Sequence, residues 1–290
     1  MDERRDGPDE HHSEETGVGS YHEPVMVEEV MEHLEPHGNG LYLDGTVGGG
    51  GHTRALLERC PGCRVVAVDR DPEALAEARR ALADFTGRVR FLHERFHEAV
   101  RDPEVRDRGL AGALLDLGVS SHQLDDDEMG TVFRELGEER RGRQLAREVV
   151  KRRRTEALTT SDDLVAALTV VLQRPPSPQE KARIFQAVRI AVNRELDALE
   201  KGLPALRDVL VDGGILVAIA YHSLEDRIVK HTFREWSKDC VCPPELPICT
   251  CRGEPLGTTL TRKPVYPSES EISRNSRARS ARLRAWRKAA

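Results

Sequence analysis

Residues 41–52 read LYLDGTVGGGGH and decide the expected fold. A short apolar run ends in Asp44, four consecutive glycines follow, and the next residues are compatible with a helix. Glycine is needed at such a turn because a side chain would keep the backbone away from a ligand and would strain positive φ values. The stretch therefore predicts a strand, a glycine-rich turn and a helix whose N-terminal N–H groups face a bound ligand.

A second apolar strand, 64–68, ends in Asp69. An acid in this position, about 20 residues after the glycine turn of a βαβ unit, can accept hydrogen bonds from ribose hydroxyls. The dinucleotide fingerprint GxGxxG is not met, because Thr53 or Arg54 stands where the third glycine belongs, and no GKS or GKT completes a P-loop. The remaining pattern, with Asp44 before the glycines, suits a cofactor with an amino-acid end and a ribose, such as S-adenosyl-L-methionine. A tight turn of an ordinary α/β protein is the alternative reading.

Three more apolar stretches are expected to be strands of the same sheet. They are 89–93, 110–115 and 215–220. Because helical segments separate the strands, we expect an α/β sheet of the doubly wound type with its ligand at the carboxyl ends of the strands.

Polar and aromatic side chains follow these strands where the ligand crevice is expected. Phe96 stands just past the third strand, where its ring could stack beside an adenine or start a helix within the core. Asp116 ends the fourth strand, where its carboxylate could orient an exocyclic amine or simply cap a loop. Tyr221 and His222 follow the fifth strand and are expected to face the crevice.

Charge is segregated along the chain, whose formal net charge is -6. Residues 1–16 hold seven acids against two bases, and 1–20 is expected to be a disordered acidic tail. Residues 251–290 hold ten bases against three acids, and the mainly helical stretch 132–172 holds nine bases between 134 and 154. The basic segments could serve a polyanion such as RNA, although charged helix faces are commonly just solvated.

The C-terminal motif SARLRAW at 280–286 allows two interpretations. Its alternation suits a closing edge strand of the sheet. Its arginines, together with Arg277 and Arg279, could instead meet phosphates.

No run of 18 apolar residues exists, and no apolar signal segment opens the chain. A cytoplasmic protein without a membrane partner is therefore expected.

The six cysteines fall into two groups. They are Cys60 with Cys63, and Cys240, Cys242, Cys249 and Cys251. Without a secretory signal, disulfides are the less expected use. The second group could supply four thiolates to zinc, but its CxC pairs are tighter than the usual CxxC, and reduced thiols in a Pro-rich loop are the alternative. No metal ligand is assigned to the cofactor site.

Several long motifs in one order resemble a single family, the bacterial 16S ribosomal RNA cytosine-N4 methyltransferases known as RsmH or MraW. The motifs are HEPV at 22–25, DGTVGGGGH at 44–52, DRDP at 69–72, DLGVSSHQLDD at 116–126, FQAVRIAVNREL at 185–196, HSLEDRIVK at 222–230 and RARSARLR at 277–284. The resemblance extends from about residue 22 to residue 287.

The resemblance implies a class I S-adenosylmethionine-dependent methyltransferase, with a Rossmann-like sheet and a helical substrate-recognition domain inserted after the fourth strand. Residues 21–123 and 186–290 would form the methyltransferase core, and 124–185 the shortened helical insertion. The methyl acceptor would be a decoding-centre cytidine of 16S rRNA, presented on the small ribosomal subunit. A homodimer is compatible with the resemblance.

Carried over by position, the resemblance also implies the cofactor site. The matching residues are Gly50, Gly51, His52, Asp69, Phe96, Asp116 and Gln123. Asp69 would hold the ribose and Phe96 the adenine side. Asp116 would also be catalytic by accepting a hydrogen bond from the N4 amine, and His222 is a second catalytic candidate in the acceptor pocket.

One departure from the family pattern lies after Gly130. The family normally follows its LDD segment with an FSFR stretch and a GPLDMRM motif, whereas here GTVFR leads directly into ELGEER at 135–140. An alternative function is therefore a cofactor-binding RNA or ribosome-assembly protein that has lost catalysis with the missing segment. A second alternative, a methyltransferase of a protein or small molecule, leaves the basic segments unexplained.

Overall fold

The structure is a computed structural model, and it describes residues 23–117, 126–155, 158, 160–221, 223–242, 250–251 and 253–290. The expected acidic tail lies outside these residues. So do Gln123, His222 and Cys249 of the predicted sites.

The described strands form one sheet with the order β3-β2-β1-β4-β5-β7-β6. They are β1 (Leu41–Asp44), β2 (Arg64–Asp69), β3 (Val89–His93), β4 (Leu110–Asp116), β5 (Leu210–Ala220), β6 (Gly257–Thr259) and β7 (Arg282–Lys288). β1 to β5 are parallel to one another, whereas β7 runs antiparallel to both β5 and β6. The predicted Rossmann-like α/β fold is therefore confirmed.

The sheet reverses its strand order between β1 and β4, which are direct neighbours with Leu43 opposite Ala113. In an open α/β sheet, such a reversal opens a crevice outside the carboxyl ends of the strands, and ligands bind there. The chain thus places the ends of β1, β2 and β4 around one crevice.

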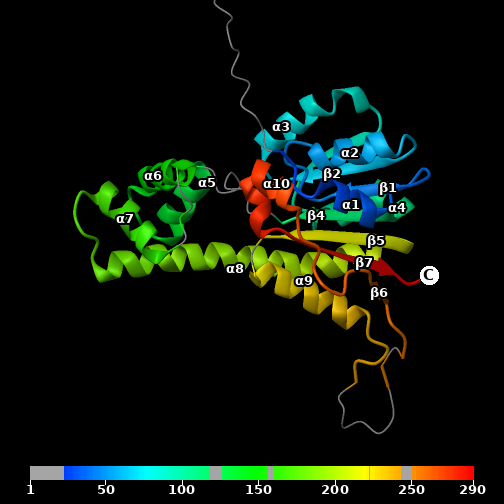
Figure 1. Cartoon of the computed structure of the whole chain (residues 1–290). Coiled ribbons are helices and arrows are strands. Elements are labelled where there is room, and N and C mark those ends of the chain that lie inside the picture. Colours follow the sequence, from blue (N-terminus) through cyan, green and yellow to red (C-terminus); the bar gives the residue numbers. More distant parts are fainter. Residues whose placement is uncertain are drawn as a thin grey trace, which may run out of the picture.

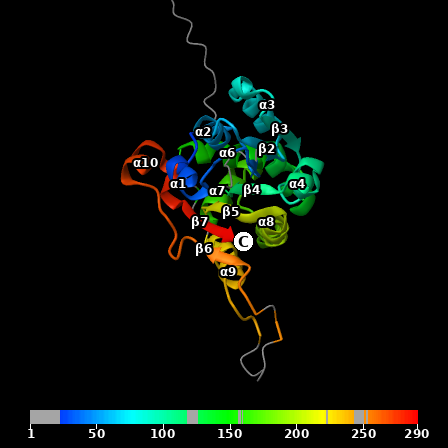
Figure 2. The same ribbon diagram turned by 90° about the vertical axis from the view of Figure 1, so that its right-hand side faces the viewer.

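The described helices either cover the two faces of this sheet or lie apart from it. They are α1 (Val27–Leu34), α2 (Gly51–Arg59), α3 (Pro72–Ala81), α4 (Pro103–Arg108), α5 (Asp126–Thr131), α6 (Gly142–Thr155), α7 (Ser161–Leu172), α8 (Pro178–Val209), α9 (Ser223–Trp236) and α10 (Glu269–Arg274), with 3-10 turns η1 (Ala83–Phe85), η2 (Ala99–Arg101) and η4 (Ser276–Ser280) and a π-helical turn η3 (Val132–Leu136). Figure 2 shows α1 and α8 on opposite sides of the strands.

Alternation along the strands explains the two-sided core. Successive side chains of a strand point to opposite faces, so Tyr42 packs with α1, α2 and α3, while Leu41 and Leu43 pack with α8 and α9. On α8, the residues Leu199, Leu203 and Leu206 recur at helical spacing and give this helix its sheet-facing side.

A third apolar cluster lies apart from the sheet. Met129, Phe133, Leu145 and Leu168 of α5, η3, α6 and α7 pack there together with Ile184 at the start of α8. Figure 1 shows these helices gathered at one end of α8, whose other end lies along the sheet. The expected boundary between residues 185 and 186 falls inside this single helix, so the assignment of 124–185 to substrate recognition stays a prediction.

Local sequence signals explain where α8 begins. Ser177 accepts a hydrogen bond from the backbone N–H of Glu180, the Glu180 side chain accepts one from the backbone N–H of Ser177, and Pro178 occupies the first turn. This reciprocal capping box satisfies two donors that a helix start otherwise leaves unpaired. The helix then continues for 32 residues.

Two details differ from the expectations. The C-terminal strand β7 lies between β5 and β6 and is therefore not the edge of the sheet. Cys60 and Cys63 are joined in a disulfide, S–S 2.02 Å, although a disulfide is the less expected use of the cysteines in this sequence. The cysteine pair lies at the short connection between α2 and β2, where the two Cα atoms are 5.4 Å apart and within bridging distance.

No helix among the described residues is both long and apolar enough to span a membrane.

Candidate cofactor and methyl-transfer site

Three carboxylates stand at the ends of adjacent parallel strands. Asp44 ends β1, Asp69 ends β2 and Asp116 ends β4. The first two are buried, whereas the Asp116 side chain remains 21% exposed. The three acids therefore line one edge of the sheet with different access to a ligand.

Asp44 holds the glycine turn from inside. It accepts hydrogen bonds from the Thr53 hydroxyl at 2.7 Å and from the backbone N–H of Thr46 at 3.2 Å. Burial raises the pKa of Asp44 to about 6, and the neighbouring His52 and the Thr53 hydroxyl oppose that rise. Asp44 therefore links the strand end to the start of α2 and is too buried to meet a ligand directly.

Asp69 fixes the other side of the same turn. One of its oxygens accepts the backbone N–H of Gly48 at 2.9 Å, and the other accepts that of Asp71 at 3.0 Å. Burial raises the pKa of Asp69, although these two N–H groups act against it. The backbone N–H of Arg70 also donates to this carboxylate. A carboxylate has about four lone-pair sites, so three backbone bonds leave room for a ribose hydroxyl, as the sequence predicted.

The glycines are required by conformation and by close packing. Gly48 and Gly50 have φ values of 50° and 86°, in the region that side chains rarely adopt. A Cβ on Gly51 would lie 2.6 Å from Cγ of Pro24. The proline of the HEPV motif therefore presses against the turn, which explains why two motifs far apart in the sequence contact each other.

His52 connects this turn to Asp116. Its Nε2 lies 2.8 Å from the carbonyl oxygen of Val25, so this nitrogen carries the proton that is donated there. Its Nδ1 then faces the Asp116 carboxylate at 3.9 Å. The buried imidazole thus positions α2 against β4 beside the crevice.

Asp116 is held from three elements. Its backbone N–H donates to the Thr46 hydroxyl at 2.7 Å. Its carboxylate interacts with the Tyr221 hydroxyl, just past β5, and with the guanidinium of Arg277 in η4. The carboxylate therefore has a fixed position at the end of β4, as a group that must orient a substrate requires.

Tyr221 and Arg277 are the main residues whose roles sequence reasoning missed. Burial and the adjacent Asp116 raise the pKa of Tyr221 far above its ordinary value, so its hydroxyl stays protonated and donates. Burial lowers the pKa of Arg277, while Tyr221 and Asp116 act in the opposite direction. The sequence suggested Arg277 as a phosphate contact, but the structure places it half-buried beside the crevice.

Phe96 lies next to the turn but faces α8. A Cβ on Gly45 would lie 2.8 Å from Cβ of Phe96, and a Cβ on Gly202 would lie 2.1 Å from the edge of its ring. The ring thus packs against Gly202 as part of the core cluster beneath the crevice. Its predicted place beside an adenine stays a prediction, as do the roles of Gln123 and His222 outside the described residues.

The model of the MraW methylase family matches residues 19–131 and 127–289. The chain belongs to this family. Membership confirms the resemblance and the predicted methyl donor, S-adenosyl-L-methionine. The crevice fits this donor, because N–H groups of the glycine turn can meet its amino-acid carboxylate, Asp69 has lone pairs for its ribose, and Asp116 can attract its sulfonium charge.

Relatives of this methylase family cover nearly the whole chain. The ribosomal RNA small subunit methyltransferase H of Gemmatimonas aurantiaca is 47% identical over 308 residues, covering 94% of this chain and 96% of the relative. That of Heliobacterium mobile is 40% identical, covering 92% and 99%. A solved rRNA methylase from Streptococcus thermophilus aligns with a TM-score of 0.43 and 12% identity over 91% of this chain and 94% of its own, which is too remote to support conclusions about the site.

The family match also locates the departure seen in the sequence. Its two pieces overlap at residues 127–131, within α5. The Gemmatimonas alignment extends over 308 residues, more than the 290 of this chain. The relative therefore has residues without a counterpart here, and the break in the family match falls where the GPLDMRM-type segment was expected.

Proposed function

We propose that the chain transfers a methyl group from S-adenosyl-L-methionine to N4 of a decoding-centre cytidine in 16S rRNA of the small ribosomal subunit. Family membership supports the methylase chemistry. The names of the relatives above support small-subunit rRNA as the substrate class. The observation that carries the proposal is Asp116 at the crevice: its backbone N–H donates to Thr46, and its carboxylate accepts from Tyr221 near the positive charge of Arg277.

The acceptor chemistry explains why a fixed carboxylate would matter. The lone pair of a cytosine amine is delocalised into the ring, so the amine is a poor nucleophile. By accepting an N4–H hydrogen bond, Asp116 would turn the amine so that its lone pair points toward the methyl group. S-adenosylmethionine, when bound, would supply an activated methyl group on a sulfonium. As the N–C bond replaces the C–S bond, the Asp116 carboxylate that accepts the N4–H hydrogen bond would take up the proton that N4 loses.

Other described residues would prepare this step without entering it. Tyr221 donates to Asp116 and limits its rotation, and His52 keeps α2 close to the same carboxylate. Catalysis would come from orientation and electrostatics rather than from a covalent enzyme intermediate. His222 is retained as a second acceptor-pocket candidate from its sequence position alone.

A basic stripe on the helical insertion supports an RNA substrate. Arg143, Arg147 and Lys151 are exposed and follow one another at four-residue spacing along α6. Residues four apart lie on the same face of a helix, so three positive charges line one side of α6. Such a stripe suits the phosphate backbone of RNA, and we propose the helical insertion as the recognition element.

The second candidate function is cofactor-dependent RNA binding without methyl transfer. The observation favouring it is the break in the family match at 127–131, in α5, the first described helix after β4 in the chain. A segment lost there could have closed the crevice over the acceptor base. This candidate predicts normal binding of S-adenosylmethionine without turnover.

Methylation of small ribosomal subunits with labelled S-adenosylmethionine distinguishes the two candidates. Subunits lacking this modification would be incubated with the full chain, and the modified nucleoside would be identified by mass spectrometry. Calorimetry would measure cofactor binding in parallel, and Asp116→Ala would be the matched inactive variant. N4-methylcytidine at the decoding centre supports the proposal, whereas cofactor binding without methylated RNA supports the second candidate.

A further inference from the structure

A loop rich in cysteine leaves the sheet between α9 and β6. Its base is closed by a backbone hydrogen bond from Leu256 to the carbonyl of Trp236 at 2.8 Å and by the Ser237 and Thr259 hydroxyls at 2.9 Å. Figure 1 shows the described parts of the loop extending from the ends of α9 and β6. The described parts of this loop hold Cys240, Cys242 and Cys251.

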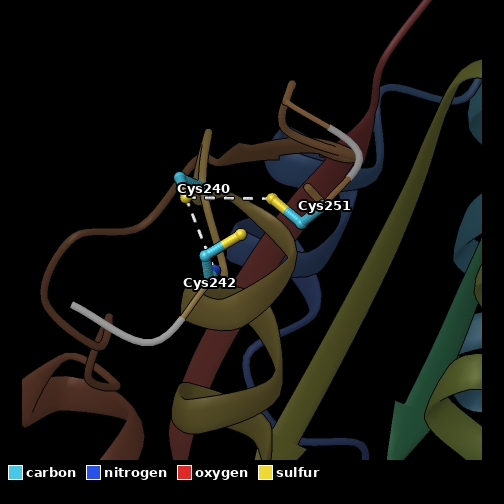
Figure 3. Close-up of side chains that lie close together, drawn as sticks. All are labelled: Cys240, Cys242 and Cys251. Carbon is cyan, nitrogen blue, oxygen red and sulfur yellow. Dashed lines mark hydrogen bonds between the residues drawn. The ribbon is translucent and has the colours of Figure 1, made fainter. Parts of the chain in front are cut away.

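The three sulfur atoms converge on one point. All lie within 4.8 Å of one another, and Sγ of Cys240 is 3.8 Å from Sγ of Cys251. Figure 3 shows the three side chains close together, with the sulfur of Cys251 directed toward that of Cys240. In a tetrahedral zinc site with Zn–S bonds of about 2.3 Å, neighbouring sulfurs are about 3.8 Å apart. The cluster therefore has nearly the dimensions of such a site.

Backbone N–H groups point at each of these sulfurs. Cys240 accepts from the N–H of Cys242 at 3.4 Å, Cys251 from that of Val241 at 3.4 Å, and Cys242 from that of Thr250 at 3.3 Å. Such donors favour a thiolate over a thiol.

A disulfide explains this arrangement less well. A disulfide joins two sulfurs at about 2.05 Å and leaves the third thiol without a role, whereas here three sulfurs share one centre and each has its own N–H donor. N–H donors that surround coordinating sulfurs are the outer contacts that tune and orient metal ligands.

We propose that Cys240, Cys242 and Cys251 bind a zinc ion as a structural site. The site stands apart from methyl transfer, because the 14 residues of α9 run from the end of β5 to the loop and span about 21 Å. Zinc would tie the loop together at its base, where Trp236 packs on Trp286 of β7 with ring centres 4.9 Å apart. The described residues assign three ligands, and Cys249 of the same sequence motif lies outside them.

Metal analysis of the purified full chain tests the site directly. We expect about one zinc per chain by elemental mass spectrometry. Replacement by cobalt(II) should give the visible bands of a tetrahedral thiolate site. Cys240→Ser and Cys251→Ser should each reduce zinc content at least about tenfold, whereas Cys251→His, which keeps a metal ligand, should retain it.

Matched controls separate metal loss from unfolding. Cys60→Ala combined with Cys63→Ala removes two cysteines outside the cluster and should leave the zinc content unchanged. S-adenosylmethionine binding, measured on the same samples, reports whether the crevice is intact and should persist in Cys251→Ser. Cys249→Ser shows whether a fourth thiolate takes part.

Two results would overturn the proposal, and both come from the unaltered chain. One is purified protein that contains no zinc and binds none when zinc is added, so that the three thiols are alkylated to the same extent with and without added zinc. The other is a mass-mapped disulfide between Cys240 and Cys251 in protein purified without oxidant. Neither result depends on whether the cysteine variants fold or on the methyl-transfer activity.

Discussion

Tyr221→Phe isolates the contribution of one hydroxyl group to methyl transfer. The substitution keeps the aromatic ring that packs against the core and removes only the donor to Asp116. A hydrogen bond to a charged group contributes about 1.5–3 kcal/mol. Because Asp116 is 21% exposed, water can partly replace the hydroxyl, and the lower end of that range applies. A loss of about 1.4 kcal/mol is a factor of about ten, so we expect kcat to fall about tenfold.

The assay would measure single-turnover methylation of small ribosomal subunits together with S-adenosylmethionine affinity and thermal unfolding. Cofactor affinity should change less than about threefold, because the hydroxyl acts on the orientation of Asp116. Tyr266→Phe is the matched control, since this tyrosine is 59% exposed and should behave as the unaltered chain. An unchanged kcat in Tyr221→Phe would refute the positioning role, and so would a loss confined to cofactor affinity.

Three further perturbations test the turn, its buried acid and the basic stripe. Gly51→Ala places a Cβ 2.6 Å from the Pro24 ring and should cost about 1–3 kcal/mol of unfolding free energy; a melting temperature equal to that of the unaltered chain would contradict this close packing. Asp44 has a pKa of about 6 in the folded state against an ordinary 3.8, so the folded state holds its proton more tightly than the unfolded state. The contribution of Asp44 to the free energy of unfolding therefore falls by about 3 kcal/mol as the pH rises from about 4 to 6. In denaturant unfolding, the stability of Asp44→Asn relative to that of the unaltered chain should therefore increase across this pH range. If the unfolding free energies of the two proteins change in parallel with pH, the raised pKa of Asp44 is excluded. Replacing Arg143, Arg147 and Lys151 of the basic stripe with glutamate should weaken binding to the small subunit and make it less dependent on salt concentration. The control, Arg106→Glu on α4, should leave both properties unchanged. If the two variants bind equally in filter assays, α6 does not belong to the RNA interface.

Local patterns predicted the part of the fold that depends on neighbours in sequence. The strand, glycine turn and helix at 41–59 and the acid ending β2 are read from apolar runs and conformational demands within about 30 residues. The structure adds that Asp69 also supports the turn through Gly48, a second use of an acid expected only for a ribose. Here, the sequence indicated the right residue and only part of its role.

Local sequence patterns could not predict contacts between segments that are far apart in the sequence. Arg277 is far from Asp116 in sequence, and only the antiparallel return of β7 next to β5 brings η4 to the crevice. Gly202 likewise has no sequence signal that couples it to Phe96, because the pairing depends on how α8 lies across the sheet. Position at a strand end predicted Tyr221 as a crevice residue, but its hydroxyl partner required the register of β4 and β5.

The 32-residue helix α8 has a mechanical consequence. Its Gly202 rests on Phe96 beside the glycine turn, while Ile184 near its other end belongs to the helical cluster. At 1.5 Å per residue, the distance from Pro178 to Gly202 is about 36 Å. A tilt of about 10° at the Phe96 contact would therefore move the far end by about 6 Å, which makes α8 a lever arm. The position of the helical cluster therefore depends on how α8 packs against Phe96.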